Sequence, residues 1–307
     1  MFTTILGKQI YYELYGAEHG NTLLYLHGGP GASCLDFVNQ AKSLSRKIRV
    51  IILDQLGVLR SETIAEDEDY SMEYQVEMFE EMRKSFDIEK WSILGHSYGG
   101  MLAVLYASRY PASINKMILD CPSLLFEDSA KSVAEYLSGH IASHNSRAES
   151  ELCEKLKTTD YQGGKEFIYD LLELLNCCTD MQLRNYLHGV SYEEYQKCMD
   201  TSEITDEMWT KGERHLVKLL EEPSMQKEAQ MKRISMLDNF MPMLQKITLP
   251  ILLLNGRFDP VSTERQIEYM KNKVQNLTQI VFMNSGHFPR IEEAEKYTNA
   301  VLEFLEN

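Results

Sequence analysis

Trp91-Ser92-Ile93-Leu94-Gly95-His96-Ser97-Tyr98-Gly99 is the stretch of sequence that decides the fold. Its first four residues form an apolar run typical of a buried strand, and the pattern from Met101 to Arg109 indicates a helix. Between them, Gly95 to Gly99 fits G-x-S-x-G, a sharp strand-to-helix turn that holds a reactive serine at the end of a parallel sheet. The turn is so tight that the positions two before and two after the serine must be small, which explains Gly95 and Gly99. We therefore expect Ser97 to be a catalytic nucleophile.

Strands and helices alternate on both sides of this turn. Further strands are predicted at Gln9 to Tyr15, Thr22 to Leu26, Val50 to Leu53, Ile114 to Leu119, Ile251 to Leu254 and Gln279 to Met283. Helices are predicted at Ser71 to Phe86 with Ser71 as N-cap, at Thr263 to Lys273 and at Ile291 to Leu305. This α/β order predicts a mostly parallel sheet with helices on both faces.

A long stretch after Cys121-Pro122 interrupts the alternating pattern. It is rich in Glu, Tyr and Met, has helical periodicity and contains no strong strand signal until about Ile247. Its length suits a separate unit above the sheet. We therefore expect residues 1–121 and 246–307 to form the core and residues 122–245 to form an inserted helical cap, or lid.

His27-Gly28-Gly29-Pro30-Gly31 follows the predicted strand Thr22 to Leu26, so its amides also lie at the carboxyl edge of the sheet. Acyl transfer needs two N–H groups directed at the oxyanion of the tetrahedral intermediate. The amides of Gly29 and Tyr98 can supply this oxyanion hole. A dinucleotide or phosphate loop is excluded, because the residues after Gly31, Ala32-Ser33-Cys34, do not supply the third glycine of G-x-G-x-x-G or the Lys-Ser/Thr pair that ends a P-loop.

Asp259 and His287 each follow a predicted strand, at Gly256-Arg257-Phe258-Asp259 and Ser285-Gly286-His287. Their side chains are therefore expected at the same sheet edge as Ser97. The chain order Ser, Asp, His is that of the α/β-hydrolase type of triad. We expect His287 to be the base and Asp259 to orient it.

Composition and charge limit the partners. The formal net charge of −15 argues against nucleic acid and anionic membranes, which need a cationic surface. No apolar run is long enough to span a membrane, and the N-terminal residues do not read as a signal peptide. With six cysteines and no C-x-x-C pair, we expect reduced thiols and a cytoplasmic location.

We expect no cofactor and no metal ion. His140 and His144 have the spacing of zinc-binding histidines, but Ile141 stands where the H-E-x-x-H motif has glutamate. We interpret both histidines as surface residues of the cap.

With these residues in hand, the chain resembles the prolyl aminopeptidases, or proline iminopeptidases, of the α/β-hydrolase superfamily. The resemblance rests on five stretches across the core: His27 to Gly31, Asp54-Gln55, Gly95 to Gly100, Gly256 to Asp259 and Gly286-His287. It implies a pocket between core and cap for an N-terminal residue, often proline, whose amino group is bound by carboxylates of the cap.

Two positions depart from the family pattern. Leu59 stands where the family usually has glycine, and Pro260 stands where some relatives place an amine-binding glutamate. The cap offers other glutamates that could bind the amine: Glu193, Glu194, Glu207 and Glu213. No motif selects one of them, so the substrate-binding residue stays unknown.

We therefore predict a serine hydrolase that cleaves an amide or ester bond through an acyl-enzyme on Ser97. The leading substrates are short peptides with a free N-terminus. A carboxylesterase, a lactonase or a carbon–carbon hydrolase with the same triad is the alternative, and a non-catalytic ligand receptor is a third hypothesis. The sequence leaves the oligomeric state unknown.

Overall fold

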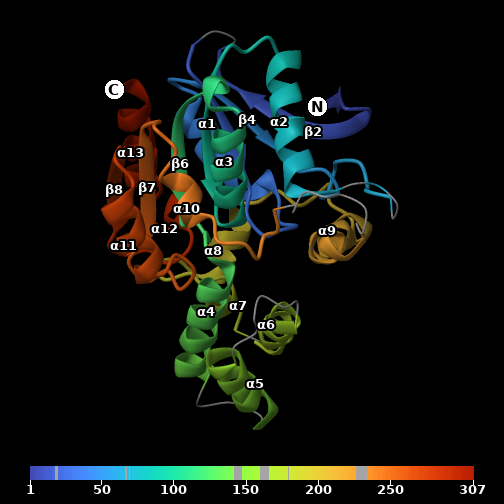
Figure 1. The fold of residues 1–307 in the computed structure, drawn as a ribbon, viewed down its shortest axis with the longest axis vertical. Helices are drawn as coiled ribbons and strands as arrows, with labels where there is room; N and C mark the ends of the chain where they lie inside the picture. The colour runs from blue at the N-terminus through green and yellow to red at the C-terminus, as the bar shows by residue number, and fades with distance from the viewer. Residues whose placement is uncertain are drawn as a thin grey trace.

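The structure, a computed structural model, describes residues 1–17, 20–65, 68, 70–141, 147–159, 166–178, 180–225 and 234–307. These residues form one eight-stranded sheet with the strand order β1-β2-β4-β3-β5-β6-β7-β8 (Figure 1). The strands are β1 (Phe2–Ile5), β2 (Lys8–Tyr15), β3 (Thr22–Leu26), β4 (Arg49–Leu53), β5 (Trp91–His96), β6 (Ile114–Asp120), β7 (Ile251–Gly256) and β8 (Leu277–Phe282). Only the pairings of β2 with β1 and with β4 are antiparallel, so the predicted mostly parallel α/β sheet is confirmed.

Helices cover both faces of this sheet because alternate strand residues point in opposite directions. Leu24 and Leu26 of β3 belong to the larger apolar cluster, whereas Leu23 and Tyr25 belong to the second one. The first cluster includes side chains of α2 (Met72–Ser85), α3 (Tyr98–Arg109), α10 (Met241–Leu244) and α11 (Glu264–Lys273). The second includes side chains of α1 (Val38–Leu44) and α13 (Ala294–Glu306), and short helices lie at η1 (Cys34–Phe37), η2 (Pro111–Ser113) and α12 (Pro289–Glu292).

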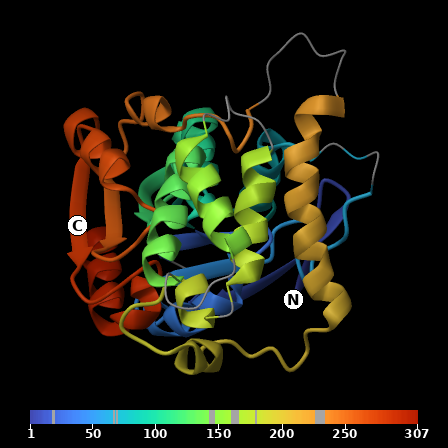
Figure 2. The same ribbon diagram turned by 90° about the horizontal axis from the view of Figure 1, so that it is seen from below.

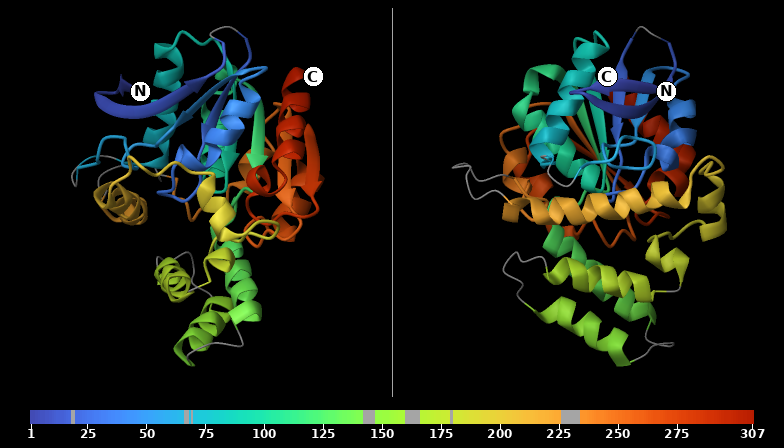
Figure 3. Two further views of the ribbon diagram at one scale, coloured as in Figure 1. Left: turned by 180° about the vertical axis from the view of Figure 1, so that it is seen from behind. Right: turned by 90° about the vertical axis from the view of Figure 1, so that its right-hand side faces the viewer.

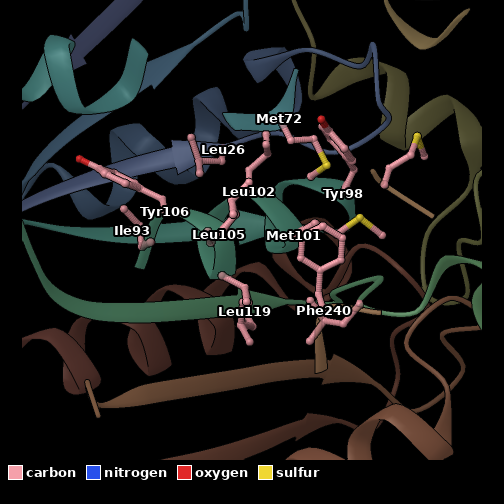
Figure 4. Close-up of a cluster of buried hydrophobic side chains, with 14 of the residues drawn as sticks. Leu26, Met72, Ile93, Tyr98, Met101, Leu102, Leu105, Tyr106, Leu119 and Phe240 are labelled. Carbon is pink, nitrogen blue, oxygen red and sulfur yellow. The ribbon is translucent and has the colours of Figure 1, made fainter. Parts of the chain in front are cut away.

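Helix α3 lies at the centre of the larger cluster. Its apolar side chains are buried between the neighbouring strands and helices, and Met101, Leu102 and Leu105 are among those drawn in Figure 4. This packing fixes the N-terminus of α3, where Ser97 is the N-cap residue.

Most predicted boundaries agree with the structure to within one or two residues, and Ser71 is the N-cap of α2 as predicted. Helix α1 was not predicted, α3 begins at Tyr98 rather than at Met101, and further details differ. Strand β1 was not predicted, and β8 begins at Leu277 and ends at Phe282 rather than at Met283. The predicted helix from Ile291 is broken at Glu293, whose φ of −129° and ψ of 52° are not helical. The carboxylate of Glu293 instead accepts bonds from Asn284 and Ser285 in the loop that precedes His287.

Between β6 and α10 the described chain is helical, and this part of the chain, called the insertion below, has two parts. Helices α4 (Phe126–Ile141), α5 (Arg147–Thr158) and α6 (Glu166–Cys177) pack on one another and extend away from the sheet (Figures 1 and 3). The chain continues through α7 (Met181–Arg184), α8 (Tyr192–Lys197) and α9 (Asp206–Met225), and α9 runs along the core. Seen from below, these helices lie over the sheet (Figure 2).

Helix α9 touches the core backbone directly. A Cβ atom on Gly212 would lie 2.3 Å from the carbonyl oxygen of Gly31, and one on Gly31 would lie 2.2 Å from that of Gly212. The Nδ1 atom of His215 is 3.0 Å from the carbonyl oxygen of Leu56, and this imidazole also contacts the Tyr70 hydroxyl. Along the described ranges, no helix combines the length and the apolar character that crossing a bilayer requires.

Candidate active site

Ser97 lies in a strained turn between β5 and α3. Its φ of 53° and ψ of −118° are rare for a residue with a side chain. The turn is closed by glycines: a Cβ on Gly95 would lie 2.2 Å from the Gly99 carbonyl oxygen, and one on Gly99 would lie 2.1 Å from that of Leu26. The Ser97 amide donates to the carbonyl oxygen of Asp120 at 3.0 Å, which ties the turn to β6. The hydroxyl is thereby held at the carboxyl edge of the sheet.

His287 and Asp259 meet at the same edge. The distance between His287 Nδ1 and Asp259 Oδ1 is 2.9 Å, and both side chains are buried. The same carboxylate accepts the amides of Val261 at 2.8 Å and Ser262 at 3.2 Å, so its orientation is fixed. Because an ionised carboxylate only accepts hydrogen bonds, Nδ1 carries the proton and Nε2 is left as a proton acceptor.

The loop that carries His287 is held by Glu292, which the sequence analysis did not identify. One oxygen of this carboxylate accepts the amides of Gly286 at 2.8 Å and Phe288 at 3.3 Å. The other accepts the amides of His188 and Gly189 in the insertion. Glu292 therefore joins the His287 loop to the insertion.

Ser97 and His287 line one cavity of about 360 Å³ between the core and the insertion. No hydrogen bond joins the Ser97 hydroxyl to the His287 ring, although both side chains belong to the described part of the chain. Such bonds are often long without substrate and shorten in the complex with substrate. The shared cavity is thus the observation that relates the two side chains.

The two predicted oxyanion residues also line this cavity. Gly29 has a φ of 114°, and a Cβ atom there would lie 2.6 Å from the amide nitrogens of Gly31 and Ala32. The Tyr98 amide is at the N-terminus of α3, where the helix dipole favours negative charge. Within the described ranges, neither amide donates to a protein acceptor, so both can receive an oxyanion.

His27 fixes the loop that contains Gly29. Its Nε2 accepts the Gln55 amide at 3.1 Å, its Nδ1 donates to the Gly28 carbonyl oxygen at 2.9 Å, and the Gln55 side chain donates to the His27 carbonyl oxygen. Burial lowers the pKa of His27, so the ring stays neutral and can make both bonds. The Asp54-Gln55 signature therefore supports the oxyanion loop.

The departure at Leu59 has a structural consequence. This leucine has a φ of 35°, in the region that favours glycine. The turn therefore has a glycine-like backbone conformation, and the leucine backbone is strained there. Its side chain is buried with Leu35 and Val58 and packs near Met199 and Met208 of the insertion. Leu59 thus adds an apolar contact between core and insertion.

The walls of the cavity are mainly apolar, with leucines from α6 and Phe126, Ala130 and Val133 from α4. Among the described lining residues, the charged side chains are Asp36 of η1 and Arg184 of α7. Neither residue is among the site residues predicted from the sequence. A single acidic or basic residue in a helix or turn carries no sequence signal that separates it from the many exposed ones.

Asp36 belongs to a buried network below the cavity. Its carboxylate accepts bonds from Tyr25 and Arg290, and Arg290 also donates to Asp120 at 3.1 Å. Two carboxylates therefore share one guanidinium. His96 contacts Asp120 and does not supply the missing positive charge, because burial and then the Arg290 charge lower the pKa of this histidine to about 4.

Of the glutamates considered for amine binding, Glu193, Glu194 and Glu207 do not line the cavity. Glu193 is exposed and pairs with Lys197 at 3.0 Å, and Glu194 closes a capping box with Ser191. Glu207 is exposed as well, and the side chain of Glu213 lies outside the described residues.

One possible metal-binding group occurs among the residues that the structure describes. Ligand atoms of Cys121, Asp259 and His287 lie within 4.8 Å of one another. Burial, followed by the Asp259 charge, raises the pKa of the Cys121 thiol, which disfavours the thiolate that a metal needs. The group is better suited to the Asp259–His287 hydrogen bond. His144 and the His140 side chain lie outside the described residues.

Comparison with known proteins agrees with this geometry. Residues 21–294 match the alpha/beta hydrolase fold family. The proline iminopeptidase of Saccharolobus solfataricus is 27% identical over 313 residues, covering 99% of this chain and 91% of that protein. That of Heyndrickxia coagulans is 26% identical over 318 residues, covering 99% and 97%. The expected resemblance to proline iminopeptidases is thus confirmed.

Solved structures with the same fold have more varied activities. The proline iminopeptidase of Mycobacterium smegmatis has a TM-score of 0.67 at 18% identity and covers 100% of this chain and 98% of its own. A meta-cleavage product hydrolase from Pseudomonas fluorescens IP01 has a TM-score of 0.62 at 20% identity, covering 100% and 97%. A thermophilic esterase from Thermogutta terrifontis has a TM-score of 0.65 at 20% identity, covering 100% and 98%.

Proposed function

The chain belongs to the α/β-hydrolase family as a hydrolase of the serine type, and from this premise we propose that it is a proline iminopeptidase-like aminopeptidase. It removes the N-terminal residue from short peptides that have a free amino group. Similarity to proline iminopeptidases over almost the whole chain supports this proposal.

In the proposed acylation step, the Ser97 oxygen attacks the carbonyl carbon of the first peptide bond. His287 Nε2 takes the hydroxyl proton, and the amides of Gly29 and Tyr98 stabilise the oxyanion. His287 then protonates the leaving amine, the C–N bond breaks and the acyl-enzyme remains. Asp259 keeps the proton on Nδ1 and stabilises the imidazolium, as its 2.9 Å bond to His287 allows.

Deacylation repeats these steps with water as the nucleophile. His287 takes a proton from the water, the new oxyanion forms against the same two amides, and the proton returns to Ser97 as the amino acid leaves. The Ser97–His287 hydrogen bond is expected to shorten when substrate fills the cavity. Side chains and backbone amides of the chain perform every step.

The observation that carries the aminopeptidase proposal is the position of Asp36 in the cavity wall. Among the described residues, Arg290 is the one permanently charged cation that pairs with Asp36 and Asp120, so this buried network has one negative charge in excess. A substrate ammonium beside Asp36 neutralises that charge. The amine anchor that the family resemblance places on the cap is thus assigned here to the core.

The experiment compares proline and alanine arylamides, the same compounds with acetylated amines, and short acyl esters. A free amine should raise kcat/KM about 10- to 100-fold, the effect of one charge-assisted hydrogen bond. Asp36→Asn should remove this preference and leave the turnover of acetylated compounds unchanged. Equal rates for free and blocked amines in the unsubstituted protein would disprove the aminopeptidase assignment.

The second candidate is a carboxylesterase, a lactonase or a carbon–carbon hydrolase with the same triad. The largely apolar cavity wall supports this alternative. The same comparison decides it, because such an enzyme would cleave neutral esters faster than any aminoacyl arylamide. A ligand receptor would bind these compounds without cleaving them.

We also propose that residues 122–245 act as a cap over a core formed by residues 1–121 and 246–307. The cavity between the two supports this division, because it is lined from both sides. A cytoplasmic location is proposed from the cysteines, since the described chain includes all six and no disulfide joins them.

A further inference from the structure

We propose that Arg184 binds the carboxylate of the leaving group, so that the preferred substrates are free dipeptides rather than longer or amidated peptides. This inference rests on the proposed aminopeptidase function and names its substrate class. Asp36 would hold the ammonium of the first residue, and Arg184 would hold the terminal carboxylate of the second.

Arg184 is a half-buried guanidinium at the edge of an apolar cavity. In the part of the chain that the structure describes, its side chain forms no ion pair and donates no hydrogen bond. Asp180, four residues earlier, makes no ion pair with it in the described chain; one oxygen of that carboxylate instead accepts the amides of Gln182 and Leu183 as the N-cap of α7. The guanidinium is therefore available to a ligand.

The backbone places Arg184 on the side of the cavity where the leaving group departs. The backbone carbonyl oxygen of Tyr186, two residues further on, accepts the His287 amide at 2.9 Å. The ring centroids of Tyr186 and His287 are 5.9 Å apart. In the proposed mechanism His287 delivers the proton to the leaving amine, so the second residue of the substrate must lie beside this histidine. A carboxylate on that residue would face α7.

The short helix is rigid enough to position a ligand. The Arg184 amide donates to the Asp180 carbonyl oxygen at 2.9 Å, and the Asn185 side chain donates to the Met181 carbonyl oxygen at 2.6 Å. Glu292 binds the amides of His188 and Gly189 immediately after it. The segment that carries Arg184 is thus fastened to the loop that carries His287.

The chemistry of the cavity selects a zwitterion of limited size. The planar guanidinium fork matches a carboxylate in a bidentate manner, and the low polarity around it strengthens that bond. The volume of about 360 Å³ is near the lower end for small-molecule sites, where a dipeptide is accommodated more readily than a long chain. One carboxylate and one guanidinium therefore complement the two charged ends of a dipeptide.

The test measures kcat and KM for the dipeptide Pro-Leu, its C-terminal amide and the proline arylamide. The unsubstituted protein should prefer the free dipeptide over its amide by about 10- to 100-fold in kcat/KM. Arg184→Gln should lower kcat/KM for the dipeptide to the level of the amide, mainly through KM. The amide and the arylamide, which lack a carboxylate, should be cleaved at unchanged rates.

Two further variants make the test specific. Arg184→Lys should restore part of the preference, because it keeps the charge without the bidentate fork. Lys197→Gln removes a positive charge from the same insertion outside the cavity, where Lys197 pairs with Glu193, and should change nothing.

The inference is overturned if the dipeptide and its amide are cleaved equally, or if Arg184→Gln slows all three compounds alike. Neither result contradicts the proposed function, because both can be observed only if the protein cleaves proline compounds that have a free amine. Failure to cleave any of the three compounds would instead refute the aminopeptidase proposal, and the dipeptide assignment with it.

Discussion

The two walls of the cavity are built differently. Behind the core wall, the groups that position the catalytic residues are bonded: Asp259 accepts three hydrogen bonds, and His27 makes both ring bonds. On the wall formed by the insertion, apolar side chains of α4 and α6 dominate and Arg184 has no protein partner in the described chain.

This difference separates chemistry from selection. Groups that stabilise a transition state must be held in place before the reaction, which explains the dense bonding on the core wall. Groups that choose a substrate must exchange water for the ligand, so an unpaired guanidinium in an apolar surround is suited to that purpose. The predictions below test where this division holds, from the largest expected effect to the smallest.

Ser97→Ala should abolish chemistry without abolishing binding. We expect kcat/KM to fall at least about 10⁴-fold, as in serine hydrolases that lose their nucleophile. Dipeptide affinity, measured by calorimetry, should remain within a few-fold, because Asp36 and Arg184 are untouched. Turnover that persists in this variant would show that Ser97 is not the nucleophile.

Gly212→Val tests whether the walls are independent. A side chain here meets the Gly31 carbonyl oxygen, so it should displace the oxyanion loop and lower kcat about 10²-fold, comparable to the loss of one oxyanion donor. Kinetics on the proline arylamide measure this effect. Gly139→Val, in α4 where a Cβ meets nothing within 4 Å, is the matched control and should leave kcat unchanged. An unaffected Gly212→Val enzyme would mean that α9 does not hold the loop.

Glu292→Gln tests the residue that bonds to both walls. The amide loses charge-assisted bonds to the His287 loop and to His188 and Gly189, so we expect kcat to fall about tenfold, equivalent to about 1.4 kcal/mol. KM for the dipeptide should rise as well, because α7 loses its support. Glu306→Gln, an exposed carboxylate that pairs with Lys47, is the control. A fall in kcat with an unchanged KM for the dipeptide would show that Glu292 supports the His287 loop but not α7.

His215 gives the smallest effect, on stability against pH. Burial lowers the pKa of His215 to about 3 from its ordinary 6.5. Below pH 6.5 the unfolded chain therefore binds a proton that the folded chain refuses, and stability falls until the pH reaches the folded pKa. This histidine should contribute a slope of about 1.4 kcal/mol per pH unit in that window.

His215→Gln should reduce that slope, whatever its effect on stability at pH 7. Urea unfolding at pH 7, 6 and 5 measures the difference between the variant and the unsubstituted protein. The exposed His188 is the control, and His188→Gln should leave the slope as it is. An unchanged slope in His215→Gln would contradict a neutral, buried imidazole between α9 and the core.

The sequence predicted most of the core correctly, because local patterns carried the information. Strand Thr22–Leu26 and the N-cap Ser71 agree with the structure residue for residue. The errors lie where neighbours decide: β1 is a short edge strand defined by its pairing with β2, and the helix break at Glu293 follows from bonds to Asn284 and Ser285. No local sequence pattern predicts the β1 pairing or the helix break.

The sequence by itself determined the α/β sheet and the candidate triad of Ser97, Asp259 and His287, because glycine-dependent turns and apolar strands leave signatures in consecutive residues. Only the tertiary structure decided the roles proposed for Asp36, Glu292 and Arg184. Each acts through a partner or a cavity assembled from distant segments, as when Asp36 meets Arg290. Burial and unmet charge are properties of the folded surroundings, and a side chain acquires them only when those segments come together.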